Sequence, residues 1–214
     1  MVNISNLMCT LASQRKAYHS EADFQHALAW ELHKQFPESS VWLERPLKAN
    51  GKKLHLDFLI QLDDKAIAVE LKYKTRKLVL DAERESLNLA NHGAQDLGRY
   101  DFIKDIERLE SITSSLVSCD GIAIFLTNDD AYWKPRSRVT VDQAFNLTEG
   151  NALTGSLAWG DGASDGTKKN REKELQLVGE YKLSWNDFSL ASQEKYAQFR
   201  YLAVHVPSSK RTAD

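Results

Sequence analysis

Apolar side chains recur at helical spacing in two stretches near the N-terminus. The first predicts a short amphipathic helix over residues 4–17. The second predicts a helix that begins at Ser20, which can cap it while Asp23 completes a capping box three residues later. We expect this second helix to end at Pro37. The side chains of its predicted core stripe are Phe24, Leu28, Leu32 and Phe36.

The pattern then changes to a period of two, which is typical of half-buried strands. It predicts strands over residues 41–48, 54–62 and 66–73. Turns at residues 49–52 and 63–65 separate them, and the first contains Asn-Gly, a strong hairpin signal. The three strands should therefore form an antiparallel meander.

Alternation also assigns side chains to the two faces of this meander. In the second strand, Asp57 should point away from the apolar row formed by Leu54, Leu56, Phe58, Ile60 and Leu62. In the third strand, Glu70 and Lys72 are two residues apart and should share the face opposite Ile67, Val69, Leu71 and Tyr73.

A long helical pattern covers about residues 94–116, and a continuous apolar run covers residues 121–127. Such a run is typical of a central strand that is covered on both faces. The third strand, the helix and this run form a crossover unit, which should be right-handed and make the last strand parallel to the third. The buried side of the helix should be Leu97, Tyr100, Ile103, Ile106, Leu109 and Ile112.

The C-terminal part of the chain has a weaker pattern. Residues 160–172 have the composition of a loop, and strand-like segments around residues 152–159, 175–185 and 199–206 could extend the sheet. We expect an α/β (α+β) fold with a mixed central sheet flanked by helices. One domain should cover residues 1–214, with a core at about 18–130 and a C-terminal extension at about 131–214.

Composition narrows the functional classes only slightly. The chain has 214 residues, 42% of them hydrophobic and 27% charged, with a formal net charge of -2. This balance excludes a generally basic nucleic-acid coat but not a nuclease, because metal-binding carboxylates offset local basic patches. No apolar run approaches the roughly 18 residues of a membrane span, and no signal-peptide pattern opens the chain, so we expect a cytoplasmic protein.

Two carboxylates and a lysine should meet on one face of the meander. Asp57 and Glu70 lie on neighbouring strands, and Lys72 lies beside Glu70. Two carboxylates suit a hard cation such as Mg²⁺, which prefers oxygen ligands and retains several waters. Such an ion polarises a phosphate oxygen and lowers the pKa of a bound water, and an ammonium group stabilises the negative charge of the transition state.

With these residues and this order of elements, the sequence resembles the PD-(D/E)XK nuclease superfamily, the restriction-endonuclease-like fold. The resemblance covers about residues 18–130 and implies an αβββαβ core. It departs from the family pattern at Leu56, which stands in place of the proline of the family's name. The matching residues are Glu21, Asp57 in Leu56-Asp57-Phe58, and Glu70-Leu71-Lys72.

The resemblance implies a role for each residue. Asp57, Glu70 and the backbone carbonyl of Leu71 would bind Mg²⁺, for which Mn²⁺ could substitute, and Glu21 would support the metal site. Lys72 would orient or activate the attacking water. Some branches of the family add a glutamine on the crossover helix, for which Gln95 is the candidate.

Each of these residues also has a plain structural interpretation. The Asp57, Glu70 and Lys72 side chains could form an exposed polar sheet face, with a cross-strand ion pair worth about 0.2–1 kcal/mol. Glu21 could simply favour the dipole of the helix that it begins, and Gln95 could be an ordinary helix-start residue. The short acidic-x-Lys pattern also occurs at residues 63–65 and 180–182, but without an aspartate in an upstream strand.

A basic run follows the third strand directly. Its members Lys74, Arg76 and Lys77 lie where a phosphate backbone would approach, although charge runs are often only solvated faces. The leading hypothesis is therefore a Mg²⁺-dependent deoxyribonuclease, acting in defence against foreign DNA or in DNA repair. A homodimer is compatible with it.

Two other classes stay open. One is a catalytically inactive module on the same fold that binds nucleic acid or protein. The other is an enzyme acting on another phosphate ester, which would be expected to carry a Gly-rich phosphate loop or a His/Asp metal cluster. Neither feature is evident in the sequence.

Overall fold

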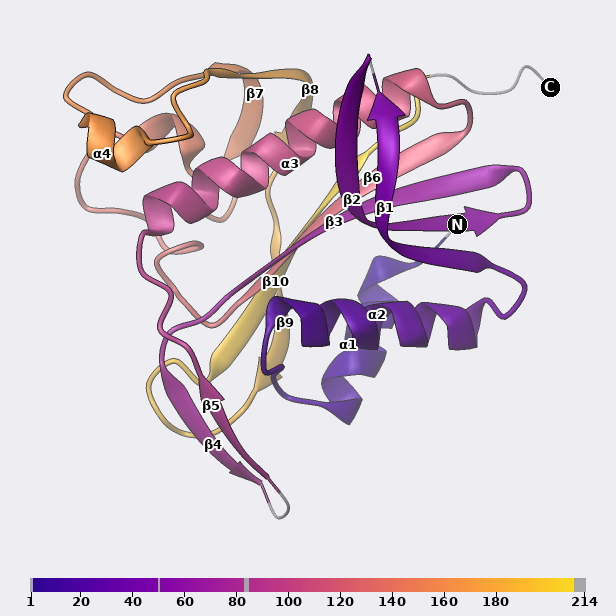
Figure 1. The fold of residues 1–214 in the computed structure, drawn as a ribbon. Helices are drawn as coiled ribbons and strands as arrows, with labels where there is room; N and C mark the ends of the chain where they lie inside the picture. The colour runs from indigo at the N-terminus through magenta and orange to yellow at the C-terminus, as the bar shows by residue number, and fades with distance from the viewer. Residues whose placement is uncertain (1, 50, 83–84, 210–214) are drawn as a thin grey trace.

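The computed structural model describes residues 2–49, 51–82 and 85–209, and its centre is a six-stranded mixed sheet (Figure 1). The strand order is β1-β2-β3-β6-β10-β9. Strands β3 and β6 are parallel, and the other neighbouring pairs of this sheet are antiparallel. The strands are β1 (Ser40–Ala49), β2 (Lys52–Leu62), β3 (Lys65–Lys74), β6 (Cys119–Thr127), β9 (Trp185–Leu190) and β10 (Gln198–Val206).

Two N-terminal helices cover one face of this sheet. Helix α1 (Ile4–Gln14) is shorter than the predicted helix over residues 4–17, because the backbone becomes extended at Arg15. Helix α2 (Glu21–Gln35) begins as predicted, and the Ser20 hydroxyl accepts a 3.2 Å hydrogen bond from the Asp23 N–H. It ends two residues before Pro37.

The antiparallel meander and the parallel fourth strand are confirmed by the strand pairing. The predicted turn after β1 includes Asn50, which lies outside the described residues. The single apolar row predicted for β2 is wrong. Leu54 and Leu56 pack in the cluster under α3, whereas Phe58, Ile60 and Leu62 pack in the cluster under α1 and α2.

The two faces of β2 exchange at Asp57 because the strand bends there. The β1–β2 pairing is interrupted between Leu43↔Phe58 and Arg45↔Leu56, and Glu44 has a left-handed φ of 49°. Beyond this point β2 also leaves β3, since their pairing covers only Phe58 to Leu62 of β2. Asp57 therefore lies at a fork between two strands.

The crossover helix α3 (Gln95–Ser115) covers the opposite face of the sheet and contacts β3, β6 and, outside the sheet, β8 (Leu175–Lys182) (Figure 1). Most of its predicted buried side is confirmed: Tyr100, Ile103, Ile106, Leu109 and Ile112 are each at most 1% exposed. No helix among the described residues is long and apolar enough to span a membrane.

Two small hairpins lie outside the main sheet. The hairpin of β4 (Leu78–Ala82) and β5 (Glu85–Leu89), which was not predicted, projects from the body as an arm (Figure 1). The hairpin of β7 (Ala152–Leu157) and β8 (Leu175–Lys182) packs against α3. Between β7 and β8 the predicted loop at 160–172 includes a one-turn helix, α4 (Asp165–Lys168), and a 3₁₀ turn, η1 (Gln143–Phe145), precedes β7. Of the C-terminal segments, only β9 and β10 extend the sheet.

Candidate active site

Glu70 and Lys72 project from β3 toward α3, on the same face of the sheet. The Lys72 Nζ atom lies 2.6 Å from Asp105 Oδ2, and the Glu70 Oε2 atom lies 2.7 Å from Arg108 Nη2. Asp105 and Arg108 are one turn apart on α3 and 2.6 Å from each other. Glu70 is only 1% exposed, so this face is a buried charged interface between sheet and helix and not an exposed polar surface.

Asp57 reaches the same place from the fork. Because β2 no longer pairs with β3 beyond Val69, the Leu71 N–H has no strand partner in β2, and it donates a 2.6 Å hydrogen bond to Asp57 Oδ2. The side chain of Gln25, on α2, stabilises the bend of β2 at Asp57. It donates to the Asp57 carbonyl at 2.7 Å and to Glu44 at 3.1 Å.

Glu21 satisfies the next free N–H along β3. Its Oε2 atom accepts a 2.7 Å hydrogen bond from Tyr73 N–H, two residues beyond Leu71. The first residue of α2 is thereby held against β3, close enough for its charge to act on both Asp57 and Lys72. Lys72 Nζ donates to the Leu71 carbonyl at 3.1 Å, so that carbonyl also belongs to this group.

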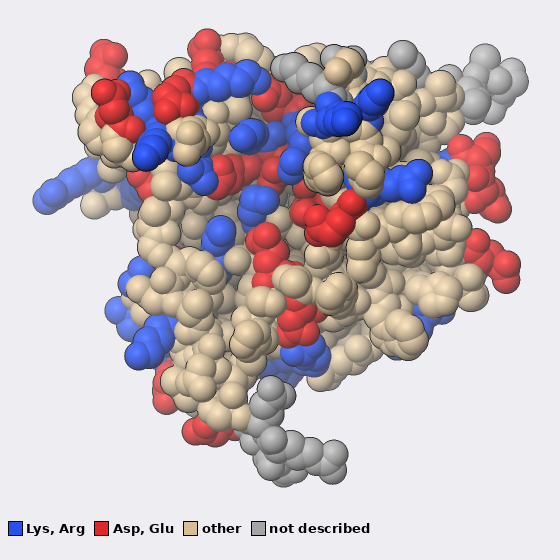
Figure 2. Space-filling view, viewed as in Figure 1, with Lys and Arg blue, Asp and Glu red and all other residues tan. Residues whose placement is uncertain are grey.

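We call these six charged side chains the Asp57 cluster: Glu21, Asp57, Glu70, Lys72, Asp105 and Arg108. Four are carboxylates and two are cations, so full ionisation leaves two negative charges without a partner in the cluster. A divalent cation would balance them. On the face in Figure 2, acidic and basic side chains are interleaved over α3 and in the band between α3 and α2.

The electrostatics of the cluster follow from burial. Burial, and after it the Asp105 carboxylate, raises the pKa of Glu70 well above its usual value. Burial also raises the pKa of Asp57 and outweighs the hydrogen bond from Leu71, which lowers it. Burial alone would lower the pKa of Lys72, but the carboxylates of Asp105, Glu21 and Asp57 together outweigh this and raise it. Lys72 is thus a firmly charged ammonium group beside two carboxylates that are costly to ionise.

The donor set fits a Mg²⁺ ion in part. Neither oxygen of Glu70 receives a well-aligned hydrogen bond from the described residues, since the Arg108 contact is short but poorly directed. Asp57, Glu70 and the Leu71 carbonyl would supply three oxygens, and Mg²⁺ commonly completes its shell with water. The described residues contain no preformed group of three or more His, Cys, Asp or Glu side chains for a metal.

Gln95 is not brought to this cluster. Its Nε2 atom donates to Asp129 Oδ2 at 2.8 Å, beyond the end of β6. It begins α3, ten residues before Asp105, which is about 15 Å along the helix axis. Its contacts are those of a residue that joins the start of α3 to the segment after β6.

The basic run leaves β3 toward the end of β6. Arg76 is anchored there: its N–H donates to Asn128 Oδ1 at 2.7 Å, and its guanidinium lies 5.1 Å from the centre of the Tyr196 ring. Lys74 is half-buried and Lys77 is exposed. Arg76 is thus held just beyond the carboxyl ends of β3 and β6.

Sequence reasoning missed Asp105, Arg108 and Gln25. An acidic and a basic residue one turn apart on α3 are an ordinary surface pattern. Only the position of α3 across β3 turns this pair toward Glu70 and Lys72. Gln25 lies next to the predicted core residue Phe24, and no sequence pattern marks it, but the structure buries it to 8% exposure and pairs it with Asp57 and Glu44.

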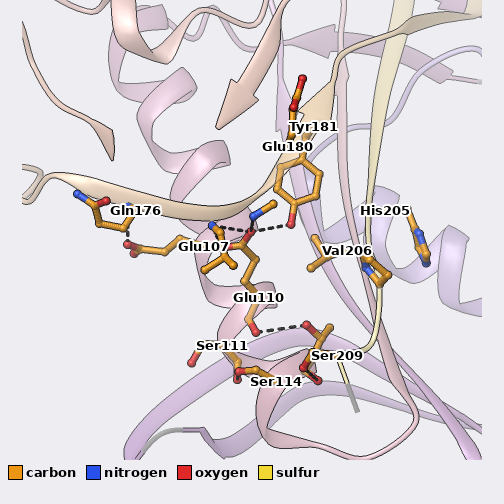
Figure 3. A pocket seen from close by; sticks show the side chains of 14 residues that line it. Glu107, Glu110, Ser111, Ser114, Gln176, Glu180, Tyr181, His205, Val206 and Ser209 are labelled. Carbon is orange, nitrogen blue, oxygen red and sulfur yellow. Dashed lines mark hydrogen bonds between the residues drawn. The ribbon is translucent and has the colours of Figure 1, made fainter. Parts of the chain in front are cut away.

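A separate cavity lies on the other side of α3. It measures about 550 Å³ and is lined by residues from α3, β8 and the end of β10 (Figure 3). Its main carboxylate, Glu110, is already paired. Glu110 accepts hydrogen bonds from the N–H groups of Val178 and Gly179 and from the Tyr181 hydroxyl, at 2.7 to 3.1 Å. We assign this cavity to the junction between α3 and β8.

Comparisons with models of protein families, with curated proteins and with solved structures found no match to this chain.

Proposed function

We propose that this protein is a Mg²⁺-dependent nuclease that hydrolyses phosphodiester bonds in DNA. The observation that carries the proposal is the gathering of Asp57, Glu70 and Lys72 at the fork between β2 and β3. A buried carboxylate and a partly buried one, both with raised pKa values and beside a charged lysine, form an environment that costs folding free energy, and such sites are enriched in catalytic residues.

The order of elements supports a restriction-endonuclease-like fold for the core. A helix, three antiparallel strands, a crossover helix and a strand parallel to the third follow one another from α2 to β6. The residues that carry the resemblance to the PD-(D/E)XK superfamily are on the elements that this order requires: Glu21 on the first helix, Asp57 on the second strand, and Glu70 and Lys72 on the third. Glu21, Asp57, Glu70 and Lys72 also interact with one another.

In this proposal Asp57, Glu70 and the Leu71 carbonyl would hold the metal, and Glu21 holds β3 in place through Tyr73. A bound Mg²⁺ would polarise the phosphate and acidify a water molecule. Lys72 orients that water and stabilises the charge that develops on the phosphate. Asp105 keeps the Lys72 ammonium charged and directed, and the basic run of Lys74, Arg76 and Lys77 contacts the phosphate backbone.

A plasmid-nicking assay tests the proposal. Supercoiled DNA should be cut in Mg²⁺ or Mn²⁺ and left intact in EDTA, and an Asp57→Asn variant should leave it intact in all conditions. DNA that is cut equally well by the wild type and Asp57→Asn would show that the nuclease activity, if real, belongs to another site or to a contaminant. The same assay with RNA as the substrate shows whether the protein cuts DNA, RNA or both.

One observation favours a second function, a catalytically inactive binding module. Arg108 lies 2.7 Å from Glu70 and already places a positive charge where a metal ligand would act. If this ion pair is permanent, Arg108 takes the place of the metal, and the cluster serves only to hold α3 on β3. Arg108→Ala would then give a less stable protein that gains no affinity for Mg²⁺. In the nuclease, the same change frees Glu70 and should strengthen Mg²⁺ binding.

A further inference from the structure

A pocket of about 350 Å³ opens beside the first turns of α3, apart from the Asp57 cluster. Arg99 lines it from the helix, and the segment after β6 contributes most of the remaining wall. The charged side chains of its lining are Arg99, Asp130, Lys134, Arg136 and Arg138. Four of these five carry a positive charge.

Two of the cations are held in place by a buried carboxylate. Asp142 is 3% exposed, and its two oxygens lie 2.8 Å from Arg99 Nη1 and 2.7 Å from Arg136 Nη1. Lys134 pairs with Asp130 at 2.7 Å. The pocket and its support thus contain four cations and two carboxylates, which leaves two positive charges over.

Exposed cations at the pocket point to a ligand. Lys134 is exposed, whereas Arg99 is 5% exposed and contributes its charge from beneath the surface. Arg138 is exposed and forms no ion pair within the described part of the chain. The carboxylate of Asp129, next to Asp130 in the chain, accepts hydrogen bonds from Gln95 and the Ala131 N–H.

We propose that this pocket binds the terminal phosphate of a nucleic-acid strand. A phosphate monoester carries close to two negative charges above its second pKa of about 6, which matches the surplus of the pocket. A phosphodiester within the strand carries only one. Guanidinium groups suit phosphate because their parallel N–H donors match its oxygens.

The choice of a nucleic-acid strand as the source of this phosphate rests on the proposed nuclease function. Arg99 precedes Asp105 by six residues on α3, which is about 9 Å along the helix axis. A strand would cover this distance in a few nucleotides. A strand end held by the exposed side chains of Lys134 and Arg138, over the charges of Arg99 and Arg136, would therefore bring a bond near that end to Asp57 and Glu70.

Binding without divalent metal tests the pocket apart from any cleavage. Single-stranded oligonucleotides with a 5′-phosphate, a 3′-phosphate or neither are titrated in EDTA with the full-length protein. We expect one phosphorylated form to bind at least about tenfold more tightly than the unphosphorylated strand, the scale of one or two charge-assisted hydrogen bonds. The Lys134→Gln/Arg138→Gln variant should lose this preference. Neither side chain is buried, so the fold should tolerate both changes.

The control is Lys53→Gln/Lys65→Gln, which removes the same charge from two exposed lysines on β2 and β3. It should keep the preference. Equal binding of the three oligonucleotides, or a preference that survives in Lys134→Gln/Arg138→Gln, would overturn the proposal. So would competition by inorganic phosphate with no preference among the strands, which indicates a site for free phosphate. If the protein prefers phosphorylated ends but never cuts nucleic acid, the pocket proposal stands and the nuclease proposal is wrong.

Discussion

Two glutamates meet α3 in this protein, and their surroundings differ. Glu110, on the helix itself, accepts hydrogen bonds from two backbone N–H groups and a tyrosine hydroxyl of β8 (Figure 3). Glu70, on β3, is almost fully buried, lies among other carboxylates and receives no well-aligned hydrogen bond from the described residues.

The difference separates a structural carboxylate from a candidate catalytic one. Glu110 stabilises the fold because its charge is satisfied by neutral donors, which ties β8 to α3. Glu70 lacks such donors, and burial of a poorly paired charge costs free energy. A protein keeps a group of this kind where function requires it, and a bound cation would offset the cost.

The largest expected effect concerns cleavage. Asp57→Asn and Glu70→Gln should each lower the rate of metal-dependent DNA cleavage on the order of 10³-fold or more, because a neutral amide is a poor ligand for Mg²⁺. Glu110→Gln is the matched control and should cut at the wild-type rate. Plasmid nicking at saturating Mg²⁺ measures all three. Equal losses in Glu70→Gln and Glu110→Gln would erase the distinction between the two carboxylates.

Lys72 should affect turnover but not metal binding. Lys72→Ala retains Asp57 and Glu70, so it should bind Mg²⁺, yet it should cut about 10²–10³-fold more slowly, the scale of one lost charge stabiliser. Single-turnover cleavage at saturating Mg²⁺ measures this rate. Wild-type activity in Lys72→Ala would show that the protein is a nuclease in which Lys72 has no catalytic role.

For the free energy of unfolding, the order of the two glutamates should be reversed: loss of Glu110 should matter more than loss of Glu70. Glu110→Ala leaves the donors of Val178, Gly179 and Tyr181 without their partner and should cost about 1–3 kcal/mol in the free energy of unfolding. Glu70→Gln removes a charge that its surroundings disfavour, so it should leave this free energy unchanged or raise it. Urea denaturation in EDTA compares the two variants with the wild type. Strong destabilisation by Glu70→Gln would identify Glu70 as a structural residue.

The smallest effect is the pH dependence of this difference. Burial, then Asp105, raises the pKa of Glu70 in the folded protein. The stability that a raised pKa contributes is fully present below the unfolded value of about 4.3 and is lost as the pH rises through the folded value. The gain in stability of Glu70→Gln over the wild type should therefore grow from pH 4 to pH 8 in EDTA. A gain that is independent of pH would mean that Glu70 stays paired when it is ionised.

Much of the core could be predicted from the sequence because its signals are local. Ser20 caps α2, and strict alternation in β3 puts Glu70 and Lys72 on one face. The bend at Asp57 could not be predicted, since Leu54, Leu56 and Phe58 read as one continuous apolar row. The positive φ at Glu44 and the hydrogen bonds of Gln25 that accompany the bend are tertiary features.

The remaining partners depend on how elements pack. Asp105 and Arg108 reach β3 only because the middle of α3 packs over Glu70 and Lys72. Gln95, predicted to join the site, pairs with Asp129 instead, because it begins α3 whereas Asp105 and Arg108 lie near the middle of that helix. The β4–β5 arm was missed because its two strands are only five residues each, and a short charged stretch separates them.

Direct titration of a divalent metal tests the central claim most simply. Calorimetry with Mg²⁺ or Mn²⁺ should show one binding event in the wild type and in Glu110→Gln. The event should be absent from Asp57→Asn and Glu70→Gln, because each has lost one of the two carboxylate ligands. A wild type that binds neither ion, or an Asp57→Asn variant that binds them as the wild type does, would contradict the account.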